Sequence, residues 1–547
     1  MGDTIDGTAE KIDWDRPTIF YNEYVKWGVY GLVLLFVVWS YWEIRITPAR
    51  LLIGLEQAGE LAGQAWPPDF SADRRARIWN NILETLAMAT VATVGGVILS
   101  VPIAIMGSRN LVSATVFRIG RTVIATSRAF HALIIAIIMV KAVGFGPLAG
   151  ILTLVVKTVG FFSKLLAEEI EDIDPTQLEA VQASGAGRFQ TYVYAVVPQV
   201  AQRFVALSIY RFDINLRGST IVGIVGAGGI GHTLITAFDR YEFDFATAIL
   251  LVIIALVLVG EAVSAVVRKR MEAGGSRGVV EGEPTDDRTS WARFDKKQQA
   301  LRYGFTVAVV AALIASWNHL AMGIGVVRTA PAELWDLWTR MWPPSVEILP
   351  ELVSALVASI HIAILGTILG IVLSVPTAII AADKTTPNAA TYALGKFIVT
   401  ATRSVNVIIW VLVLVLLFGT GALAGVIAIG IRSVGFIGKL LAEAIEEIDM
   451  VQVEAVKATG AGRLEAAVYG IVPQVKPAFI GISTYRWDSN VRASTVIGFV
   501  GGGGIGTLLL ANVNTFLWSN ALTILVAILG VVLFSEVVSA YARRKVM

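Results

Sequence analysis

The sequence predicts an all-α polytopic membrane protein with two tandem parallel repeats of about six transmembrane helices each. Of its 547 residues, 55% are hydrophobic and 16% are charged, with a mean hydropathy of +0.70. Soluble domains carry about 25% charged residues, so this composition indicates a chain that is mostly embedded in lipid. Residues 160–231 align without a gap on residues 435–506, with 42 identities in 72 positions. The chain is therefore an internal duplication with a shift of 275 residues.

Composition also excludes several function classes. A net charge of +2 is too small to suggest a nucleic-acid partner. The absence of cysteine excludes disulfides, thiolate metal sites and cysteine nucleophiles. Residues 1–26 are rich in acidic side chains and lack the basic start of a signal peptide, so we expect a cytoplasmic N-terminal tail.

Uncharged or weakly charged runs divide the rest of the chain into two membrane domains, residues 27–267 and 302–542. A charged, glycine-containing linker at 268–301 separates them, and a basic tail at 543–547 follows. An even number of spans per repeat gives both domains one orientation, and the positive-inside rule then places both termini in the cytoplasm. The expected spans lie near 27–42, 85–108, 122–143, 147–166, 199–225 and 245–267, and near 303–322, 348–382, 393–418, 423–441, 474–500 and 516–538.

A short polar helix is expected between the fourth and fifth spans of each domain. In the first domain Asp174 is the predicted N-cap, Gln177 stands at the capping-box position and Gly185 ends the helix. Asp449, Gln452 and Gly460 repeat these features in the second domain. Such a helix can dock into a soluble partner, or it can be an ordinary loop helix, and local chemistry does not separate the two.

Cationic residues recur at matching positions within the spans of both domains. An arginine at the centre of a bilayer costs roughly 2.5 to 3.5 kcal/mol, so it is expected to face a cavity or a partner. Cations along a path suit an anionic solute, and guanidinium groups bind phosphoryl oxygens in pairs. The predicted path residues are Arg128, His131, Asn215, Arg217 and Ser219 of the first domain, with Arg403, Asn406, Asn490, Arg492 and Ser494 of the second.

Two other recurring pairs have simpler alternatives. Arg211 stands two residues before Asp213, and Arg486 two before Asp488, which leaves an internal ion pair as an interpretation. Lys157 and its counterpart Arg432 can snorkel towards the membrane surface.

Other motifs limit the chemistry. Residues 226–231 and 501–506 both match GxGxxG, but no strand–helix unit surrounds them, so close helix packing is the better interpretation. No GxxxxGK[ST] motif occurs, so we expect no P-loop ATP hydrolysis in this chain. Trp335, Trp338 and Trp342 have helical spacing, and we expect an interfacial helix that anchors in the bilayer or docks an external partner.

The polar helix then shows a family resemblance. Glu179-Ala-Val-Gln-Ala-Ser-Gly185, followed by Val197-Pro198, resembles the coupling loop of ABC-importer permeases, apart from small apolar exchanges at Val181 and Val197. The stretch from Tyr210 to Gly231 resembles the phosphonate permeases, and the second domain repeats it. The resemblance implies a type I ABC importer permease fold with two permease domains fused in one chain. The implied coupling residues are Asp174, Glu179, Ala180, Gly185 and Gly187, with Asp449, Glu454, Ala455, Gly460 and Gly462.

The resemblance also implies partners and a function. It implies two ATP-binding ABC subunits that carry ATP and Mg, one extracytoplasmic solute-binding protein, a bacterial inner-membrane location and no cofactor in this chain. The expected function is ATP-driven import of phosphonate-class anions by alternating access, with alkylphosphonate, phosphate and phosphite as solutes. The alternatives are a permease of the same fold for methionine or another small organic solute, and an ion-coupled secondary transporter, since parallel repeats also occur there.

Overall fold

The computed structural model describes residues 23–44, 47–275, 296–321 and 324–546, and this part of the chain contains helices and no strands. We call the helices up to Gly275 the first half and those from Lys296 the second half. The first half contains α1 (Glu23–Ile44), α2 (Pro48–Ala65), α3 (Ala72–Met106), α4 (Ala114–Ala129), α5 (Ala132–Val143), α6 (Pro147–Glu171), α7 (Pro175–Ala183), α8 (Arg188–Thr191), the π-helix η1 (Tyr192–Val196), α9 (Val197–Gly223), α10 (Ile230–Asp239) and α11 (Phe243–Gly275).

The second half repeats this order with one additional 3₁₀ turn. It contains α12 (Lys296–His319), α13 (Ile324–Met341), α14 (Leu349–Ala381), α15 (Ala389–Ser404), α16 (Val407–Phe418), α17 (Ala422–Glu446), α18 (Met450–Ala458), α19 (Arg463–Ala466), the π-helix η2 (Ala467–Ile471), α20 (Val472–Ile497), the 3₁₀ turn η3 (Gly498–Val500), α21 (Ile505–Asn514) and α22 (Trp518–Val546). The parallel all-α duplication predicted from the sequence is therefore confirmed.

The boundaries of the predicted segments shift by several residues. α11 continues to Gly275 and α12 begins at Lys296, so the helices extend into the predicted linker, and residues 276–295 lie outside the described part. Of the predicted N-terminal tail, residues 1–22 also lie outside it, and α1 begins at Glu23. The predicted basic tail continues α22 as far as Val546.

Two predicted spans are broken rather than straight. α4 and α5 meet at 90°, and α15 and α16 meet at 92°, so the unbroken spans expected at 122–143 and 393–418 are wrong. The break follows from local capping. The side chains of His131 and Asn406 accept hydrogen bonds from Leu133 N (3.3 Å) and Ile408 N (3.1 Å), which starts a new helix at each position.

Fewer spans pass a test of length and apolarity than the twelve expected. Among the described residues six single helices pass, and up to nine spans result if each bent pair counts as one. α9 does not pass because it carries several charged residues in its interior, among them Arg211, Asp213 and Arg217. In the first helix of each half, the described side chains give the shorter apolar stretches Leu34–Ile44 and Thr306–His319.

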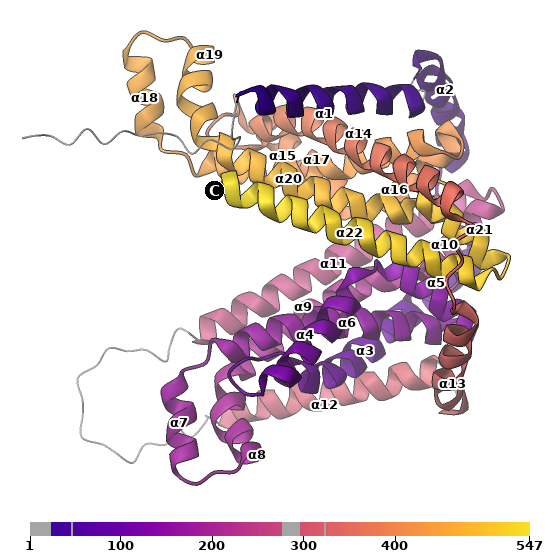
Figure 1. Cartoon of the computed structure of the whole chain (residues 1–547), viewed down its shortest axis with the longest axis vertical. Helices are drawn as coiled ribbons and strands as arrows, with labels where there is room; N and C mark the ends of the chain where they lie inside the picture. Colours follow the sequence, from indigo (N-terminus) through magenta and orange to yellow (C-terminus); the bar gives the residue numbers. More distant parts are fainter. Residues whose placement is uncertain (1–22, 45–46, 276–295, 322–323, 547) are drawn as a thin grey trace, which may run out of the picture.

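The first helices are exchanged between the halves (Figure 1). α12 lies along α3, where Leu313 and Trp317 pack against a core that contains Met88. α1 lies along α14, where the rings of Phe36 and Trp39 are 5.0 and 4.6 Å from the ring of His361. The first helix of each half therefore packs on the other half. The predicted domains 27–267 and 302–542 consequently differ from the groups of helices that pack together.

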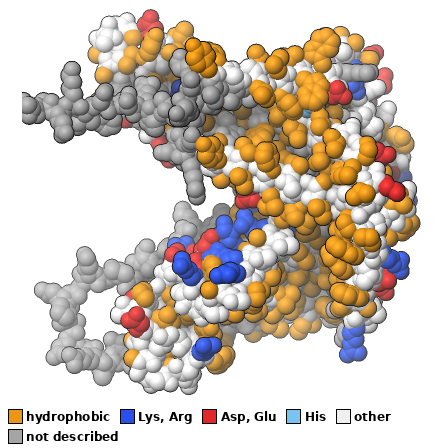
Figure 2. All heavy atoms as spheres, viewed as in Figure 1, with side chains coloured by type: hydrophobic (Ala, Val, Ile, Leu, Met, Phe, Trp, Pro, Cys, Tyr) orange, Lys and Arg blue, Asp and Glu red, His pale blue; other side chains and the backbone are white. Residues whose placement is uncertain are grey.

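Both polar helices lie at the same end of the molecule. Figure 1 shows α7 and α18 at one end, with the start of α1 and the C-terminus, and α2 and α13 at the opposite end. α2 packs against α11 and α16, and α13 packs against α5 and α22, so these two helices connect the halves. Figure 2 shows an open cleft between the halves on the side of α7 and α18, which is closed on the side of α2 and α13. The chain therefore has the shape of a clamp that opens towards its polar helices.

Candidate functional site

The polar helices α7 and α18 are capped by the predicted aspartates. The carboxylate of Asp174 accepts a hydrogen bond from Thr176 N, and that of Asp449 accepts one from Val451 N, each at 2.9 Å. Gly185 and Gly460 end the helices with φ of +82° and +86°, a conformation that favours glycine.

The predicted capping boxes through Gln177 and Gln452 are wrong. The backbone N–H of Asp174 donates instead to Oε1 of Gln199, and that of Asp449 donates to Oε1 of Gln474, both at 2.9 Å. These glutamines stand near the start of α9 and α20, 25 residues further along the chain. Each polar helix is therefore tied to the long helix that follows it.

The surface around the polar helices is exposed and partly apolar. Glu179, Ala180, Glu454 and Ala455 are all exposed, and α7 buries none of its side chains. Gly187 and Gly462 each begin a second short helix, α8 and α19, and their N–H groups donate to Gln190 and Glu465 at 2.8 and 2.7 Å. Four large side chains at matching positions of the two halves are 70 to 78% exposed, namely Phe189, Tyr194, Leu464 and Tyr469. Exposed apolar groups beside a capped polar helix make a surface suited to a protein partner.

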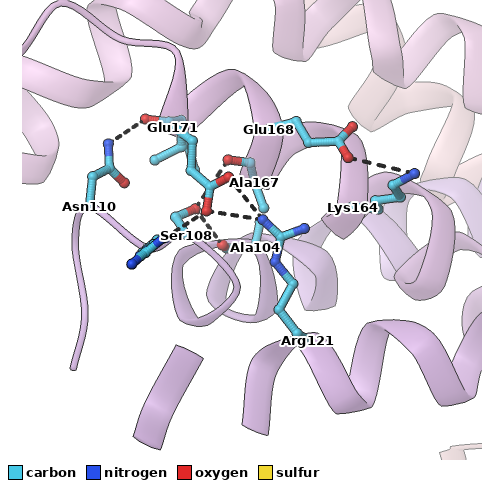
Figure 3. Close-up of polar contacts among 10 residues, drawn as sticks. Ala104, Ser108, Asn110, Arg121, Lys164, Ala167, Glu168 and Glu171 are labelled. Atoms are coloured by element: carbon cyan, nitrogen blue, oxygen red, sulfur yellow. Dashed lines mark hydrogen bonds and ion pairs between the residues drawn. The ribbon is translucent and has the colours of Figure 1, made fainter. Parts of the chain in front are cut away.

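A polar cluster connects the end of α6, which leads into α7, to the loop between α3 and α4 and to the middle of α4 (Figure 3). Glu171 accepts hydrogen bonds from Nη2 of Arg121 at 3.0 and 2.9 Å and from the N–H of Arg109 at 2.7 Å. Asn110 also donates to the carbonyl of Ile170 at 2.7 Å. In the second half Glu446 accepts hydrogen bonds from Nζ of Lys396 at 3.4 Å and from the N–H of Asp383 at 3.3 Å, and Lys384 donates to the carbonyl of Ile448 at 2.7 Å. Side-chain contacts therefore join the end of the helix before each polar helix to the preceding loop and helix in both halves.

The interiors of both halves contain matching polar contacts. Asn215 Nδ2 donates to Thr93 (2.9 Å) and Thr158 (3.0 Å), and Arg211 Nε donates to the same Thr158 at 3.0 Å. In the second half Asn490 Nδ2 donates to Thr367 and Ser433, and Arg486 Nε donates to the same Ser433. Ser219 and Ser494 donate to carbonyls of their own helices. Asn215, Ser219, Asn490 and Ser494, predicted to line a path, are fully buried here and contact neighbouring helices in this conformation.

The ion pairs differ from the sequence alternative. Asp213 pairs with Arg217, and Asp488 pairs with Arg492 at 2.6 Å. Arg211 and Arg486 are not the partners of these aspartates, because residues two apart on a helix point to different sides, whereas residues four apart are neighbours.

Cations of both halves lie within electrostatic range of one another where the halves meet. Lys157 of the first half and Arg432 and Arg492 of the second all act electrostatically on His131. Arg217 acts on Arg432 in the same way, and Arg128 acts on Lys157. We call His131, Arg217, Arg432 and Arg492 the cation cluster. Arg128 and Arg403 are exposed in the last turns of α4 and α15, beside the bends.

Two of these cationic residues, Lys157 and Arg432, were predicted from the sequence to snorkel towards the membrane surface. The signal that could have found them is their position: both stand near the middle of apolar helices, α6 and α17, at the same point of the repeat. A cation in mid-helix is too far from either membrane surface for its side chain to reach the surface easily.

The chain is also similar to known transport proteins. A family model described as the binding-protein-dependent transport system inner membrane component matches residues 79–273 and 374–546. The chain belongs to this family. The permease is 34% identical over 510 residues, 93% of this chain and 92% of the relative, to the phosphate-import permease protein PhnE of Mycolicibacterium smegmatis. It is 40% identical to the phosphite transport system permease protein PtxC of Stutzerimonas stutzeri, over 45% of this chain and 87% of that protein.

Among solved structures, a chain of the MetNI methionine ABC transporter in inward-facing conformations aligns with a TM-score of 0.34 and 22% identity, over 37% of the permease and 99% of that chain. The family match and the relative that covers nearly the whole chain show that the permease is a multi-pass inner-membrane transport subunit of an ABC importer.

One difference between the halves gives a stability prediction. Oδ1 of the buried Asp213 has no hydrogen-bond partner, whereas Oδ1 of Asp488 accepts from Ser535 at 2.8 Å. The position equivalent to Ser535 is Gly260, where an added Cβ would lie 3.4 Å from that Oδ1. A Gly260→Ser hydroxyl is therefore expected to supply the missing donor and to stabilise the permease by about 1 kcal/mol.

The measurement is the thermal midpoint of the purified permease in one detergent. Gly260→Ala is the control, because it adds the Cβ without a hydroxyl and should stabilise less. Ser535→Ala should lower the midpoint. If Gly260→Ser is no more stable than Gly260→Ala, Asp213 does not need a donor at this position.

Proposed function

We propose that this permease is the membrane subunit of an ATP-driven importer for phosphonate-class anions, including alkylphosphonates, phosphate and phosphite. The observation that carries the proposal is the cation cluster, to which both halves contribute. Its support from the comparisons is a likeness, over nearly the whole chain, to a protein named for phosphate import. Phosphoryl oxygens are strong acceptors for guanidinium groups, so cations at this point favour these solutes over zwitterions.

The partners follow from the two ends of the molecule. Two ABC subunits, which bind ATP and Mg, would dock on α7 and α18 at the cytoplasmic side, and both termini would lie on that side. One solute-binding protein would deliver the anion at the end formed by α2 and α13. No cofactor is assigned to this chain. The proposed coupling residues are the caps and exposed residues of α7 and α18, with Glu179 and Glu454 facing the ATPase.

The mechanism is alternating access driven from α7 and α18. When ATP brings the two ABC subunits together, the polar helices approach each other and close the cleft on their side. The Gln199 and Gln474 contacts pass this motion to α9 and α20, which carry Arg217 and Arg492. Glu171 passes it to α4 and so to the bend beside His131. The cation cluster thereby changes the side to which it is open.

The test is uptake by proteoliposomes that contain the permease with its ABC subunits and its binding protein. Radiolabelled phosphate, methylphosphonate and phosphite should accumulate with ATP, and methionine should not. The double variant Glu179→Lys with Glu454→Lys should lower ATP-driven uptake at least about tenfold, because it reverses charge at both docking sites.

The matched control is Asp172→Lys with Glu447→Lys, which reverses two exposed carboxylates at the same end but outside α7 and α18. It should keep most of the uptake. Normal uptake by the first double variant with the ABC subunits still bound would refute the coupling assignment. Uptake of methionine in place of the phosphorus anions would refute the solute assignment.

A further inference from the structure

Lys157 and Arg432 occupy the same position in the two halves, 275 residues apart, but they have different surroundings. Nζ of Lys157 donates to the carbonyls of Phe130 (2.8 Å) and Arg128 (3.4 Å). These carbonyls lie at the C-terminal end of α4, where the chain bends towards α5. Such carbonyls lack partners within their helix and carry the negative end of the helix dipole, so a lysine here stabilises the bend.

Arg432 makes no comparable contact. Within the described part of the chain, its guanidinium has neither a hydrogen-bond partner nor an ion-pair partner, although its side chain is half-buried in mid-helix. None of its nitrogen atoms is sealed from solvent, since none is among the buried atoms without partners. Its five N–H donors therefore face accessible space. An unpaired guanidinium at this depth is unfavourable unless it has a further partner.

The two groups of the first half that interact electrostatically with Arg432 can also donate hydrogen bonds. Arg217 of the first half acts on it electrostatically, and Arg432 acts on His131. Nδ1 of His131 accepts the hydrogen bond from Leu133 N, so a neutral imidazole carries its proton on Nε2 and can donate it. In the second half Asn406 replaces His131 as the helix cap. The side of the interface that contains Arg432 thus combines two guanidinium groups, of which that of Arg217 is paired with Asp213, and an imidazole N–H.

We infer that Arg432 forms a transient site for a tetrahedral oxyanion during transport, with Arg217 and His131 of the other half within electrostatic range of it, whereas Lys157 is structural. This inference rests on the proposed function and names the half-specific residue that contacts the solute. A phosphate or phosphonate group presents three oxygens, and the guanidinium of Arg432 can bind two of them. The two copies of one position have therefore divided their roles: one fixes a bend and the other binds the anion.

The test compares Arg432→Gln with Lys157→Gln, the same change at the equivalent position. Two readouts are used: the rate of phosphate and methylphosphonate uptake in the complete importer, and the thermal midpoint of the purified permease with and without millimolar inorganic phosphate. Arg432→Gln should lower uptake at least about tenfold, because a paired charge-assisted contact is lost. It should also abolish the rise in midpoint on adding phosphate, without lowering the midpoint in its absence.

Lys157→Gln should show the opposite pattern: a lower midpoint without phosphate and a preserved rise on adding it. Arg432→Lys, which keeps the charge but loses the paired geometry, should give an intermediate uptake rate and serves if Arg432→Gln does not fold. Wild-type uptake by Arg432→Gln or Arg432→Lys would overturn the inference and leave the proposed function standing. A rise in midpoint that depends on Arg432, in an importer that does not take up phosphorus anions, would support the site and refute the proposed function. No rise in the wild-type permease would overturn the site.

Discussion

Gly231→Val is expected to eliminate folded permease almost completely. A Cβ at Gly231 would lie 1.9 Å from the carbonyl oxygen of Thr220 and 3.2 Å from Cα of Gly223. Both contacts are to backbone atoms of α9, so α9 and α10 pack with their main chains in contact, and no flexible side chain can move aside. Overpacking costs about 1 to 3 kcal/mol even where side chains can adjust, so a backbone contact this close should cost more.

The measurement is the fraction of tagged permease that elutes as a single species from size-exclusion chromatography. Gly506→Val, at the equivalent position of the second half, should behave similarly, because its Cβ would lie 2.7 Å from the carbonyl oxygen of Thr495. Gly530→Val is the control, since its Cβ would meet no atom within 4 Å. A normal elution profile for Gly231→Val would contradict the close packing of these helices.

Asp488→Ala is expected to lower the thermal midpoint more than Asp213→Ala. Both substitutions break a pair between a buried carboxylate and an arginine whose side chain is 33 or 36% exposed. The cost is therefore below about 3 to 5 kcal/mol, the value for a pair in which the other charge stays buried. Asp488 also accepts a hydrogen bond from Ser535, whereas Oδ1 of Asp213 has no partner to lose. The extra loss at Asp488 is about 1 kcal/mol.

The comparison is made on the purified permease variants in one detergent, with midpoints followed by the same probe. Introducing Ser535→Ala into each variant is the control. It should lower the midpoint of Asp213→Ala further and have a smaller effect on Asp488→Ala. Equal midpoints for the two single variants would mean that Ser535 contributes nothing to the second half.

Local sequence patterns predicted the parts of the fold that depend on neighbouring residues. The helix caps at Asp174 and Asp449 and the glycine ends at Gly185 and Gly460 are confirmed, because a cap depends on a few consecutive residues. The Asp213–Arg217 pair was equally accessible, since four-residue spacing on a helix places both side chains on one face. The ion pair predicted as an alternative joined Asp213 to Arg211, which stands on a different face of the helix.

Other features depend on contacts between distant residues. Nothing near Asp174 indicates that Gln199, rather than Gln177, accepts its N–H. His131 lies inside an apolar run, and its role as a helix cap that bends a span has no periodic signal. The exchange of α1 and α12 depends on which apolar surface each helix covers, and apolar helices of similar composition do not identify their partners in the sequence.

The exchanged helices also determine when the protein can finish folding during its synthesis. α3 ends at Met106 and its cover α12 begins at Lys296, 190 residues later (296 − 106). At 5 to 20 residues per second, the ribosome needs roughly 10 to 40 s to make that stretch. During this interval the flank of α3 that will contact α12 is exposed to lipid or to the insertion machinery. The interval is longer for α1, because its partner α14 begins only at Leu349. The nascent chain therefore has no complete N-terminal unit to release, and both halves must mature together.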